Sequence, residues 1–269
     1  MSGIFFKHTD AFPANFPPIR ILFKRLVQAR GKCNFKRIAN RPSMNSLYKI
    51  VSLALLNLSF IHCRSQDAAL LEGIDKKLKA NEWTVSQVLC TDSLMRLHSQ
   101  KKFREVIRAN AVAGKFCMTS NSEPGTKVTI KGSVTTRRGD PIADGLVYVY
   151  QTSAKGWYSD TGAHILINSG DMNHARLFAY FRTDKHGNFI YETIKPMGYP
   201  GSDLPAHIHI HIWDRNGKTL RAPGELLFDD DDRLTEERRK ISLREGFLIV
   251  SNSGTVGAPV YEYKIIVDL

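Results

Sequence analysis

The chain has 269 residues, enough for one sizeable domain with appendages or at most two domains. Its 38 Lys and Arg residues against 26 Asp and Glu residues give a formal net charge of +12, but the excess is local. Residues 1–65 hold 11 basic residues and one acidic residue, whereas the rest of the chain holds 27 basic and 25 acidic residues. A nearly neutral folded part argues against a nucleic-acid-binding protein.

The first 65 residues predict an export signal. Residues 50–61 form a mostly apolar run behind Lys49, shorter than the roughly 20 residues of a membrane-spanning helix and similar to the hydrophobic region of a secretory signal. We expect Met44 to be the true start and the protein to be exported, with residues 1–43 as an upstream extension. Because residues 1–43 are rich in Arg and Lys, a transit peptide is their alternative interpretation.

Cys63 leaves two forms of export open. It follows the apolar run as the lipidated cysteine of a bacterial lipoprotein signal does, and a lipid there would anchor the mature chain to a membrane. His62 stands where such signals have a small residue, so plain secretion is an equal alternative. Farther along, Cys90 and Cys117 either pair in an oxidising compartment or stay as buried free thiols.

Residues 66–119 are expected to form a short helical segment. Apolar residues recur there at steps of three and four, and a second helix is expected to begin at Thr91 or Asp92, both good N-cap residues. The apolar positions of the two helices are Leu70, Leu71, Ile74, Leu78, Leu94, Met95, Leu97, Phe103, Val106 and Ile107. The expected solvent-facing positions of the second helix are Arg96, Lys101, Lys102 and Arg104. The helices are expected to pack on the next domain or to form a subunit interface in a homo-oligomer.

Residues 120–269 are expected to form the main domain, behind a turn-rich break at residues 120–125. From there the apolar residues alternate, and turn signals separate short segments. Strands are expected near residues 128–134, 146–150, 178–182, 189–193, 226–228 and 261–267, with a solvated acidic loop at 229–232 and a helical turn at 235–240. This pattern predicts a mainly β protein with an antiparallel β-sandwich or barrel.

Three histidines, His207, His209 and His211, alternate along one further strand. Alternate side chains of a strand share one face, so the three imidazoles lie on one face and the intervening isoleucines on the other. Histidines two positions apart are roughly 6.5–7 Å apart along the strand. Two of them can therefore lean toward one metal ion at about 2.0–2.1 Å each. A polar stripe that faces solvent is the alternative that this pattern alone leaves open.

Spaced motifs surround these histidines over roughly residues 125–230. They are Gly156-Trp157-Tyr158, Thr183-Asp184-Lys185-His186-Gly187-Asn188-Phe189, Thr193-Ile194-Lys195-Pro196-Met197-Gly198-Tyr199-Pro200 and Leu204-Pro205-Ala206-His207-Ile208-His209. Together they resemble the intradiol ring-cleavage dioxygenases, non-haem iron(III) enzymes that open catechols between their two hydroxyl groups. The resemblance implies a β-sandwich catalytic domain. It also implies a catechol-type aromatic and O2 as substrates and a muconate-type diacid as product.

The resemblance implies that Fe(III) is bound by Tyr158, Tyr199, His207 and His209, each of which falls on a matching position. A free tyrosine has a pKa near 10, so phenolate ligation at neutral pH needs a strongly Lewis-acidic cation, and iron(III) suits this donor. A tyrosinate is also expected to act as a base toward the catechol. His211 lies beyond the motif and is expected beside the ligands or exposed.

Trp157, Leu204 and Glu225 are the expected substrate contacts, with Tyr150 and residues 159–176 as further pocket walls. Leu204 stands where the family commonly has an arginine. The loss of that stabilising charge is expected either to lower the activity or to shift the substrate toward less polar catechols. Glu225 stands where the family often has a glutamine. The arginines that could substitute for the missing charge are Arg176, Arg182 and Arg221.

Two other functions fit parts of the sequence. Residues 129–134 and 140–147, with the Thr-Asp-x-x-Gly-x-Phe motif, also resemble transthyretin-like and collagen-binding β-sandwich modules with structural or adhesive roles. Those modules do not require Tyr199 or the alternating histidines. A cupin-type metal site would need a later histidine, and none follows His211. The enzyme is therefore the favoured interpretation.

Overall fold

The computed structural model describes residues 66–165, 170–255 and 257–268. The predicted targeting segment, with Met44, the apolar run and Cys63, lies outside the described residues. None of the described helices combines the length and the apolar character that crossing a membrane requires.

Short helices precede the strands. A helix covers residues 66–79, followed by α2 (Val85–Leu89), the 3-10 helix η2 (Asp92–Leu97) and α3 (Lys101–Ala109). Thr84 begins α2 with a capping box, in which its hydroxyl accepts from the Gln87 backbone N–H and the Gln87 side chain accepts from the Thr84 backbone N–H. The single second helix expected from Thr91 or Asp92 is thus wrong, because η2 and α3 are separate. The solvent-facing position expected for Arg104 is also wrong, since it is only 5% exposed.

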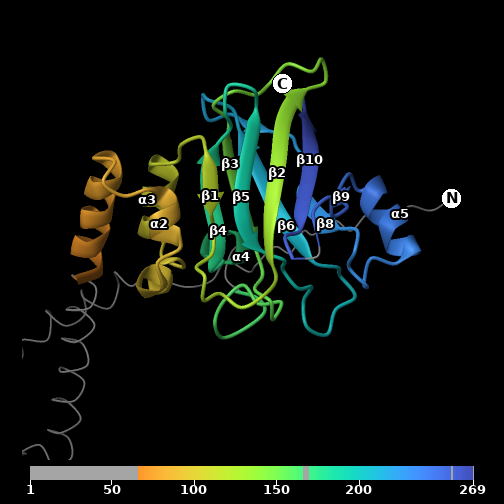
Figure 1. Cartoon of the computed structure of the whole chain (residues 1–269), viewed down its shortest axis with the longest axis horizontal. Coiled ribbons are helices and arrows are strands. Elements are labelled where there is room, and N and C mark those ends of the chain that lie inside the picture. The colour runs from red at the N-terminus through yellow and green to blue at the C-terminus, as the bar shows by residue number, and fades with distance from the viewer. Residues whose placement is uncertain (1–65, 166–169, 256, 269) are drawn as a thin grey trace, which may run out of the picture. The chain divides into compact units, whose positions relative to one another are not determined.

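Cys90 follows α2, and Cys117 lies in β1 (Lys115–Cys117), within the segment expected to be helical. Both are half-buried free thiols, and their side chains form a hydrogen bond with each other. The Ser86 hydroxyl of α2 accepts from the Cys117 backbone N–H at 3.0 Å. Helix α2 therefore packs directly on β1, as Figure 1 also shows.

Two mixed β-sheets form the main body. The four-stranded sheet has the order β1-β5-β2-β10, and the six-stranded sheet has the order β4-β3-β6-β8-β9, with β7 paired to β6. The strand bounds are β2 (Lys127–Thr136), β3 (Leu146–Gln151), β4 (Leu177–Arg182), β5 (Asn188–Ile194), β6 (His207–Trp213), β7 (Thr219–Leu220), β8 (Glu225–Phe228), β9 (Leu248–Val250) and β10 (Val260–Val267). Two further helices are α4 (Gly170–His174) and α5 (Glu236–Arg244).

The expected antiparallel pairing is wrong for three pairs of strands. β1 pairs with β5, β10 with β2, and β8 with β9, all in parallel. Parallel neighbours need a crossover connection, which α5 supplies between β8 and β9. The alternating pattern reports which face of a strand is buried, but it carries no information on the direction of the partner strand.

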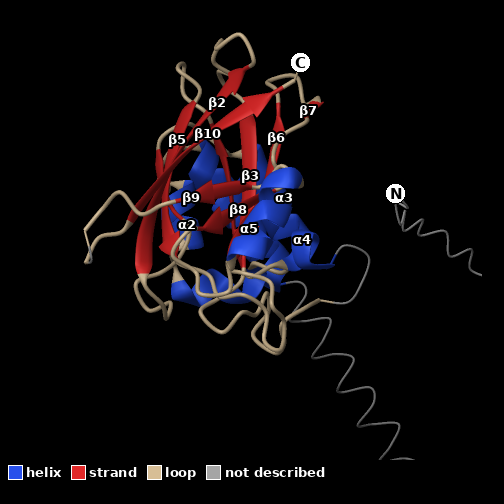
Figure 2. Cartoon of the chain, turned by 90° about the vertical axis from the view of Figure 1, so that its right-hand side faces the viewer, coloured by secondary structure: helices blue, strands red, loops and turns tan. Residues whose placement is uncertain are grey.

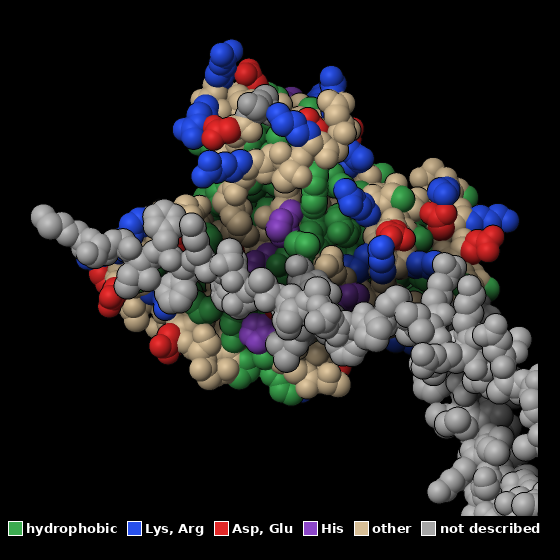
Figure 3. Space-filling model, turned by 180° about the vertical axis from the view of Figure 1, so that it is seen from behind, with side chains coloured by type: hydrophobic (Ala, Val, Ile, Leu, Met, Phe, Trp, Pro, Cys, Tyr) green, Lys and Arg blue, Asp and Glu red, His purple; other side chains and the backbone are tan. Residues whose placement is uncertain are grey.

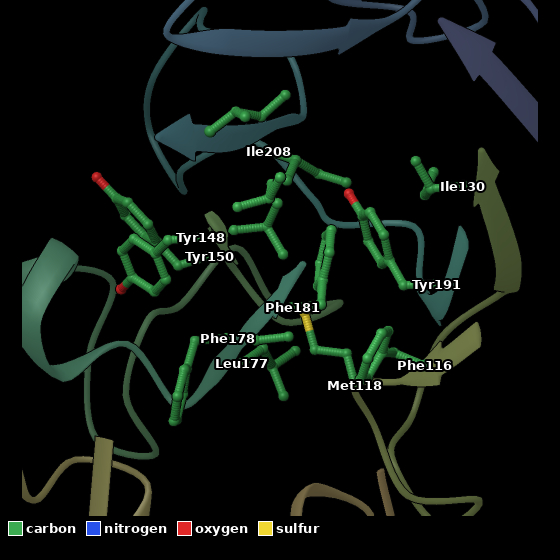
Figure 4. Close-up of a cluster of buried hydrophobic side chains, with 14 of the residues drawn as sticks. Phe116, Met118, Ile130, Tyr148, Tyr150, Leu177, Phe178, Phe181, Tyr191 and Ile208 are labelled. Atoms are coloured by element: carbon green, nitrogen blue, oxygen red, sulfur yellow. The ribbon is translucent and has the colours of Figure 1, made fainter. Parts of the chain in front are cut away.

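Aromatic side chains from both sheets pack between them. The Phe181 ring of β4 lies 5.1 Å from Phe189 and 5.4 Å from Tyr191 of β5, between ring centroids. At the other edge, Phe228 of β8 lies 4.8 Å from Tyr261 of β10. Figure 4 shows Phe181 and Tyr191 in this cluster, together with the labelled Phe116 and Met118. Residues on both sides of the break at 120–125 belong to the same hydrophobic cluster.

The opposite face of the six-stranded sheet carries polar aromatic residues. Tyr150 of β3 is the register partner of His209 of β6, and their rings stack with centroids 4.4 Å apart. Tyr148 and His211 form the next pair on this face, at 5.9 Å. Figure 4 shows Tyr148 and Tyr150 set apart from the Phe181 cluster. In Figure 2 many connecting loops gather at one end of the strands, near α4. The histidine strand thus begins beside this group of loops.

Candidate metal centre

Four side chains from three segments converge at the start of β6. Tyr158 lies in the loop after β3, Tyr199 in the loop between β5 and β6, and His207 and His209 in β6 itself. The Tyr158 Oη atom lies 2.8 Å from Tyr199 Oη and 2.8 Å from His209 Nε2. Tyr199 Oη lies 2.9 Å from His207 Nε2. All four of the residues that the sequence motif predicts as ligands are therefore brought together.

A close backbone approach aligns the two tyrosine loops. Gly156 has φ of +74°, and a Cβ atom there would lie 2.4 Å from the Gly198 carbonyl oxygen, so only glycine fits. Gly156 lies two residues before Tyr158, and Gly198 directly precedes Tyr199. The Tyr158 carbonyl accepts from the Arg176 backbone N–H at 2.8 Å, which holds the first loop against β4. Figure 1 shows both loops at the same end of the sheets, in green and cyan.

The histidine strand is anchored where it enters the sheet. The Asp231 carboxylate accepts from the Ala206 backbone N–H at 3.0 Å, one residue before His207. The expectation that residues 229–232 are merely a solvated loop is therefore incomplete. The segment is a loop, but Asp229 forms an ion pair with Arg239, and Asp230 forms one with Lys195.

The hydrogen bonds of the histidines leave their Nε2 atoms free for a ligand. His207 donates its Nδ1–H to the Pro205 carbonyl at 2.8 Å, so Nε2 is the unprotonated nitrogen of the neutral ring. His209 Nδ1 lies 3.6 Å from a Glu225 carboxylate oxygen. Burial, with smaller contributions from His207 and His211, lowers the pKa of His209 to about 3. Its ring is therefore neutral at physiological pH and available as a metal ligand.

The two tyrosines keep their protons unless a cation is present. Burial raises the pKa of Tyr199 to about 12, and burial together with the nearby Tyr199 raises the pKa of Tyr158 well above its usual range. Tyr158 is only 1% exposed, whereas Tyr199 is half-buried. A metal bound here would therefore need enough Lewis acidity to displace two phenolic protons.

The four donor atoms fit one metal ion. Two ligands about 2.0–2.1 Å from an ion and at right angles to each other lie about 2.8–3.0 Å apart. The distances of 2.8–2.9 Å among the two phenol oxygens and two imidazole nitrogens match that separation. Glu225 adds a carboxylate within 4.8 Å of the ring nitrogens of His207 and His209. A hard, highly charged cation suits this mixture of oxygen and nitrogen donors.

The three expected substrate contacts lie in different settings. Glu225 begins β8 as the register partner of His209, on the same face of the sheet, and burial raises its pKa. Leu204 is 39% exposed in the loop that leads to His207. Trp157 is half-buried, with the Lys155 ammonium 5.6 Å from its ring centroid. Of the three, Glu225 lies next to an expected metal ligand, with a carboxylate oxygen 3.6 Å from His209 Nδ1.

Two of the three arginines proposed to replace the missing charge are held by other carboxylates. Arg176 forms a two-oxygen ion pair with buried Glu123, and Arg182 pairs with Asp144. The third, Arg221, is exposed and its backbone forms an isolated β-bridge with Asp268. A fourth arginine, Arg233, is nearer to the tyrosine loop. Its guanidinium donates to the backbone carbonyls of Tyr199 at 3.1 Å and Leu204 at 3.5 Å.

His164 and Asp171 lie beside the converging tyrosines, within the expected pocket wall at 159–176, although the sequence pattern singled out neither of them. The His164 ring is 4.4 Å from the Tyr199 ring and 6.1 Å from the Tyr158 ring, between centroids. Its Nδ1–H donates to the Asp171 carboxylate at 2.8 Å. Neither residue belongs to a recognisable motif, so only the folded loop brings them to the site. Figure 3 shows several histidine side chains, in purple, gathered in a hollow near the middle of one face, with most charged side chains farther out.

Buried His98 is linked to the Tyr158 loop through Arg176. The His98 Nδ1–H donates to the Arg176 carbonyl at 2.8 Å, and the Arg176 backbone N–H donates to the Tyr158 carbonyl. Burial lowers the pKa of His98 to about 4, against about 6.5 in an unfolded chain. Between these values the unfolded state binds more protons, so stability decreases as pH falls through this window. We expect His98 to contribute about 2 kcal/mol to the loss of stability between pH 7 and pH 5.

Urea denaturation of the metal-free chain at pH 7 and pH 5 checks this prediction. The His98→Gln variant, which keeps a side-chain donor, should lose less stability over that interval than the parent chain. His186→Gln, in an exposed turn, is the matched control and should behave like the parent. An equal loss in the parent and in His98→Gln would contradict the assignment.

Comparisons with known proteins identify the family. A family model described as "Dioxygenase" matches residues 102–252, more than half of the chain. A catechol 1,2-dioxygenase of Candida albicans is 32% identical over 91 residues, which are 34% of this chain and 28% of that protein. The chain therefore aligns with less than a third of that relative's length.

Solved structures of dioxygenases are similar to the chain at low identity. The dioxygenase domain of a carbohydrate-binding fusion protein from Streptomyces sp. SirexAA-E is 19% identical, covers 59% of this chain and 90% of its own, and has a TM-score of 0.44. An intradiol ring-cleavage dioxygenase from Tetranychus urticae is 16% identical, covers 59% and 87%, and also has a TM-score of 0.44. On the extent of the family-model match, the chain belongs to the intradiol ring-cleavage dioxygenase family.

Proposed function

We propose that the protein is an exported intradiol dioxygenase that uses Fe(III) and O2 to open a catechol-type ring between its hydroxyl groups, giving a muconate-type diacid. Members of the family are non-haem iron enzymes. The observation that carries the proposal is the convergence of four donor atoms, in which Tyr158 Oη lies 2.8 Å from both Tyr199 Oη and His209 Nε2, and Tyr199 Oη lies 2.9 Å from His207 Nε2. A non-catalytic β-sandwich module would have no use for these four donors in one place.

The four residues would bind the iron, and each contributes differently. Bound Fe(III) would supply the Lewis acidity that ionises the phenols and draws the two catechol oxygens into the site. His207, oriented by the Pro205 carbonyl, and neutral His209 offer nitrogen lone pairs without first losing a proton. Tyr158, almost fully buried, is held in place by the loops around it.

Tyr199 is the better placed of the two tyrosines to exchange protons with a substrate. It is half-buried, whereas Tyr158 is 1% exposed, so an incoming catechol reaches Tyr199 more readily. Because burial raises the pKa of Tyr199 to about 12, its phenolate is a strong base once the phenol has been ionised. We therefore assign to Tyr199 Oη the role of accepting a catechol hydroxyl proton.

A visible absorption spectrum of the purified full chain, with iron quantified, tests the proposal. We expect about one iron per chain, a broad tyrosinate band that shifts when catechol is added, and O2 consumption with formation of a ring-opened diacid. Resorcinol, whose hydroxyl groups are not adjacent, is the matched control and should not produce the shift. A chain that stays colourless after loading with Fe(III) would exclude the proposed chemistry.

Export is the part of the proposal that rests on the sequence alone. The apolar run at residues 50–61 supports it, with plain secretion and lipid anchoring at Cys63 as the two forms. The mass of the mature chain distinguishes them. A chain that begins near residue 62–65 supports export, and an added lipid mass on Cys63 supports anchoring. A chain that remains inside the cell with its N-terminus uncleaved contradicts both.

A further inference from the structure

The charges that face the metal centre are negative. Glu225 lies on the β8 strand beside His209, and Asp171 lies behind His164 on the other flank. Among the described residues, neither carboxylate forms an ion pair with a lysine or an arginine. Asp171 is partly compensated, because its oxygens accept from His164 Nδ1 and from the Ile165 backbone N–H. The Glu225 carboxylate lies 3.6 Å from His209 Nδ1 and within 4.8 Å of a His207 ring nitrogen.

Glu225 lies on the face of the sheet that carries the metal-binding histidines. Register partners on neighbouring strands project to the same face of a sheet, so the Glu225 side chain shares the face of His209 and Tyr150. Its carboxylate is within 4.8 Å of the ring nitrogens of His207 and His209. The side chain is 26% exposed, so its charge is neither fully buried nor fully screened by water.

Within the part of the chain that the structure describes, no lysine or arginine forms an ion pair with Glu225. Leu204 is an apolar, partly exposed residue at the position where the resembling enzymes commonly have an arginine. Arg233, the basic residue nearest to this loop, is occupied by the carbonyls of Tyr199 and Leu204. Met197, 50% exposed two residues before Tyr199, adds a second apolar side chain at the same loop. The loop that carries Tyr199 and leads to His207 therefore exposes two apolar side chains, and Glu225 has no lysine or arginine partner among the described residues.

We infer that the site selects catechols by the charge of their ring substituent and prefers those that carry an ammonium group. The inference rests on the proposed function, because it concerns the substrate of the same metal centre. A cationic substituent is attracted by Glu225, and an apolar stem is accommodated by Leu204 and Met197. A carboxylate substituent is repelled. Over about 6–8 Å at an effective dielectric constant between 20 and 80, one such charge changes an affinity by roughly tenfold.

A series of catechols matched in size tests this selection. The probes are 3,4-dihydroxybenzylamine (cationic), 4-methylcatechol (neutral) and 3,4-dihydroxybenzoate (anionic). Each is titrated into the iron-loaded full chain without O2, with the visible band as the readout of binding, and kcat/KM is then measured with O2. We expect the amine to bind about tenfold more tightly than 4-methylcatechol, and the benzoate about tenfold more weakly.

Two variants assign the selection to Glu225. Glu225→Gln removes the charge at nearly constant volume and should reduce both ratios to about threefold or less. Glu262→Gln is the matched control, since it removes one charge from an exposed position in β10 of the other sheet and should leave both ratios unchanged. Increasing salt should weaken the preference in the parent chain and have little effect in Glu225→Gln.

The outcomes separate this inference from the proposed function. If 4-methylcatechol binds and is opened, but the parent chain binds the benzoate as tightly as the amine, the charge selection is wrong and the dioxygenase remains. If the ranking holds but Glu225→Gln keeps it, Glu225 is not its source. If none of the three catechols shifts the band of the iron-loaded chain, the proposed function fails, and the inference fails with it.

Discussion

Replacing His209 with alanine is expected to remove iron from the protein and to abolish ring cleavage. Its Nε2 atom lies 2.8 Å from Tyr158 Oη within the cluster of four donors, and no other described histidine nitrogen is in contact with that phenol oxygen. Residues that only orient a metal ligand contribute 10- to 100-fold to affinity, so loss of a ligand should weaken iron binding by more than about 100-fold. The fold should persist, because His209 projects from the polar face of β6 and leaves the inner core intact.

His211→Ala is the matched control for this prediction. It removes an imidazole from the same strand and the same face, two residues farther from the converging phenols. Its ring stacks against Tyr148 and Tyr150 at 5.9 Å and 6.0 Å and has no contact with the four donor atoms among the described residues. Iron per chain, the visible band and the thermal unfolding temperature are measured for both variants. Equal loss of iron in His211→Ala, or full retention in His209→Ala, would show that the donors are assigned wrongly.

Replacing Arg104 with methionine is expected to destabilise the fold by about 3–5 kcal/mol. The guanidinium is buried and donates to the carbonyls of Ala175 at 2.9 Å, Met172 at 3.0 Å and His98 at 3.3 Å, and also to the Tyr148 hydroxyl. Each buried acceptor left without a donor costs about 1–3 kcal/mol. The guanidinium also lies 3.8 Å from the Phe178 ring centroid, a contact that methionine replaces only in part.

The effect of Arg104 should also reach the metal centre. Of its acceptors, Met172 lies in the short helix α4 and Ala175 directly follows it. Asp171, the partner of His164, is in the same helix. Urea denaturation gives the change in the free energy of unfolding, and the visible band of the iron-loaded variant reports on the site. Arg108→Met is the control, one helical turn later and exposed, and should change stability by less than about 1 kcal/mol. A similar loss in both variants would mean that the buried network contributes little.

Several features of the fold follow directly from local patterns. The strands expected over residues 146–150 and 207–213 match β3 and β6. The helical turn expected at 235–240 matches the start of α5, where the Thr235 side chain accepts from the Arg238 backbone N–H. Strand period decides which side chains share a face, so the sequence already places His207 and His209 together. The resemblance to the intradiol dioxygenases adds Tyr158 and Tyr199 to this pair, since each falls on a matching motif position.

Other features depend on contacts between segments far apart in the chain. Arg104 is in a charged stretch, and nothing in that stretch shows that carbonyls some 70 residues later bury its guanidinium. His164 has no motif around it, yet its loop brings it to 4.4 Å from Tyr199. The parallel pairing of β2 with β10 joins segments more than 120 residues apart.

The sequence by itself determined the family, the donor residues to examine and the mainly β character, because these depend on residue type and short spacing. The tertiary structure decided which sheet edges pair in parallel, that Arg104 is buried, and that Glu225 faces the site without a basic partner. These properties arise where segments far apart in the sequence come into contact. Which side chains are buried there, and which charges lack a partner, cannot be deduced from any local pattern.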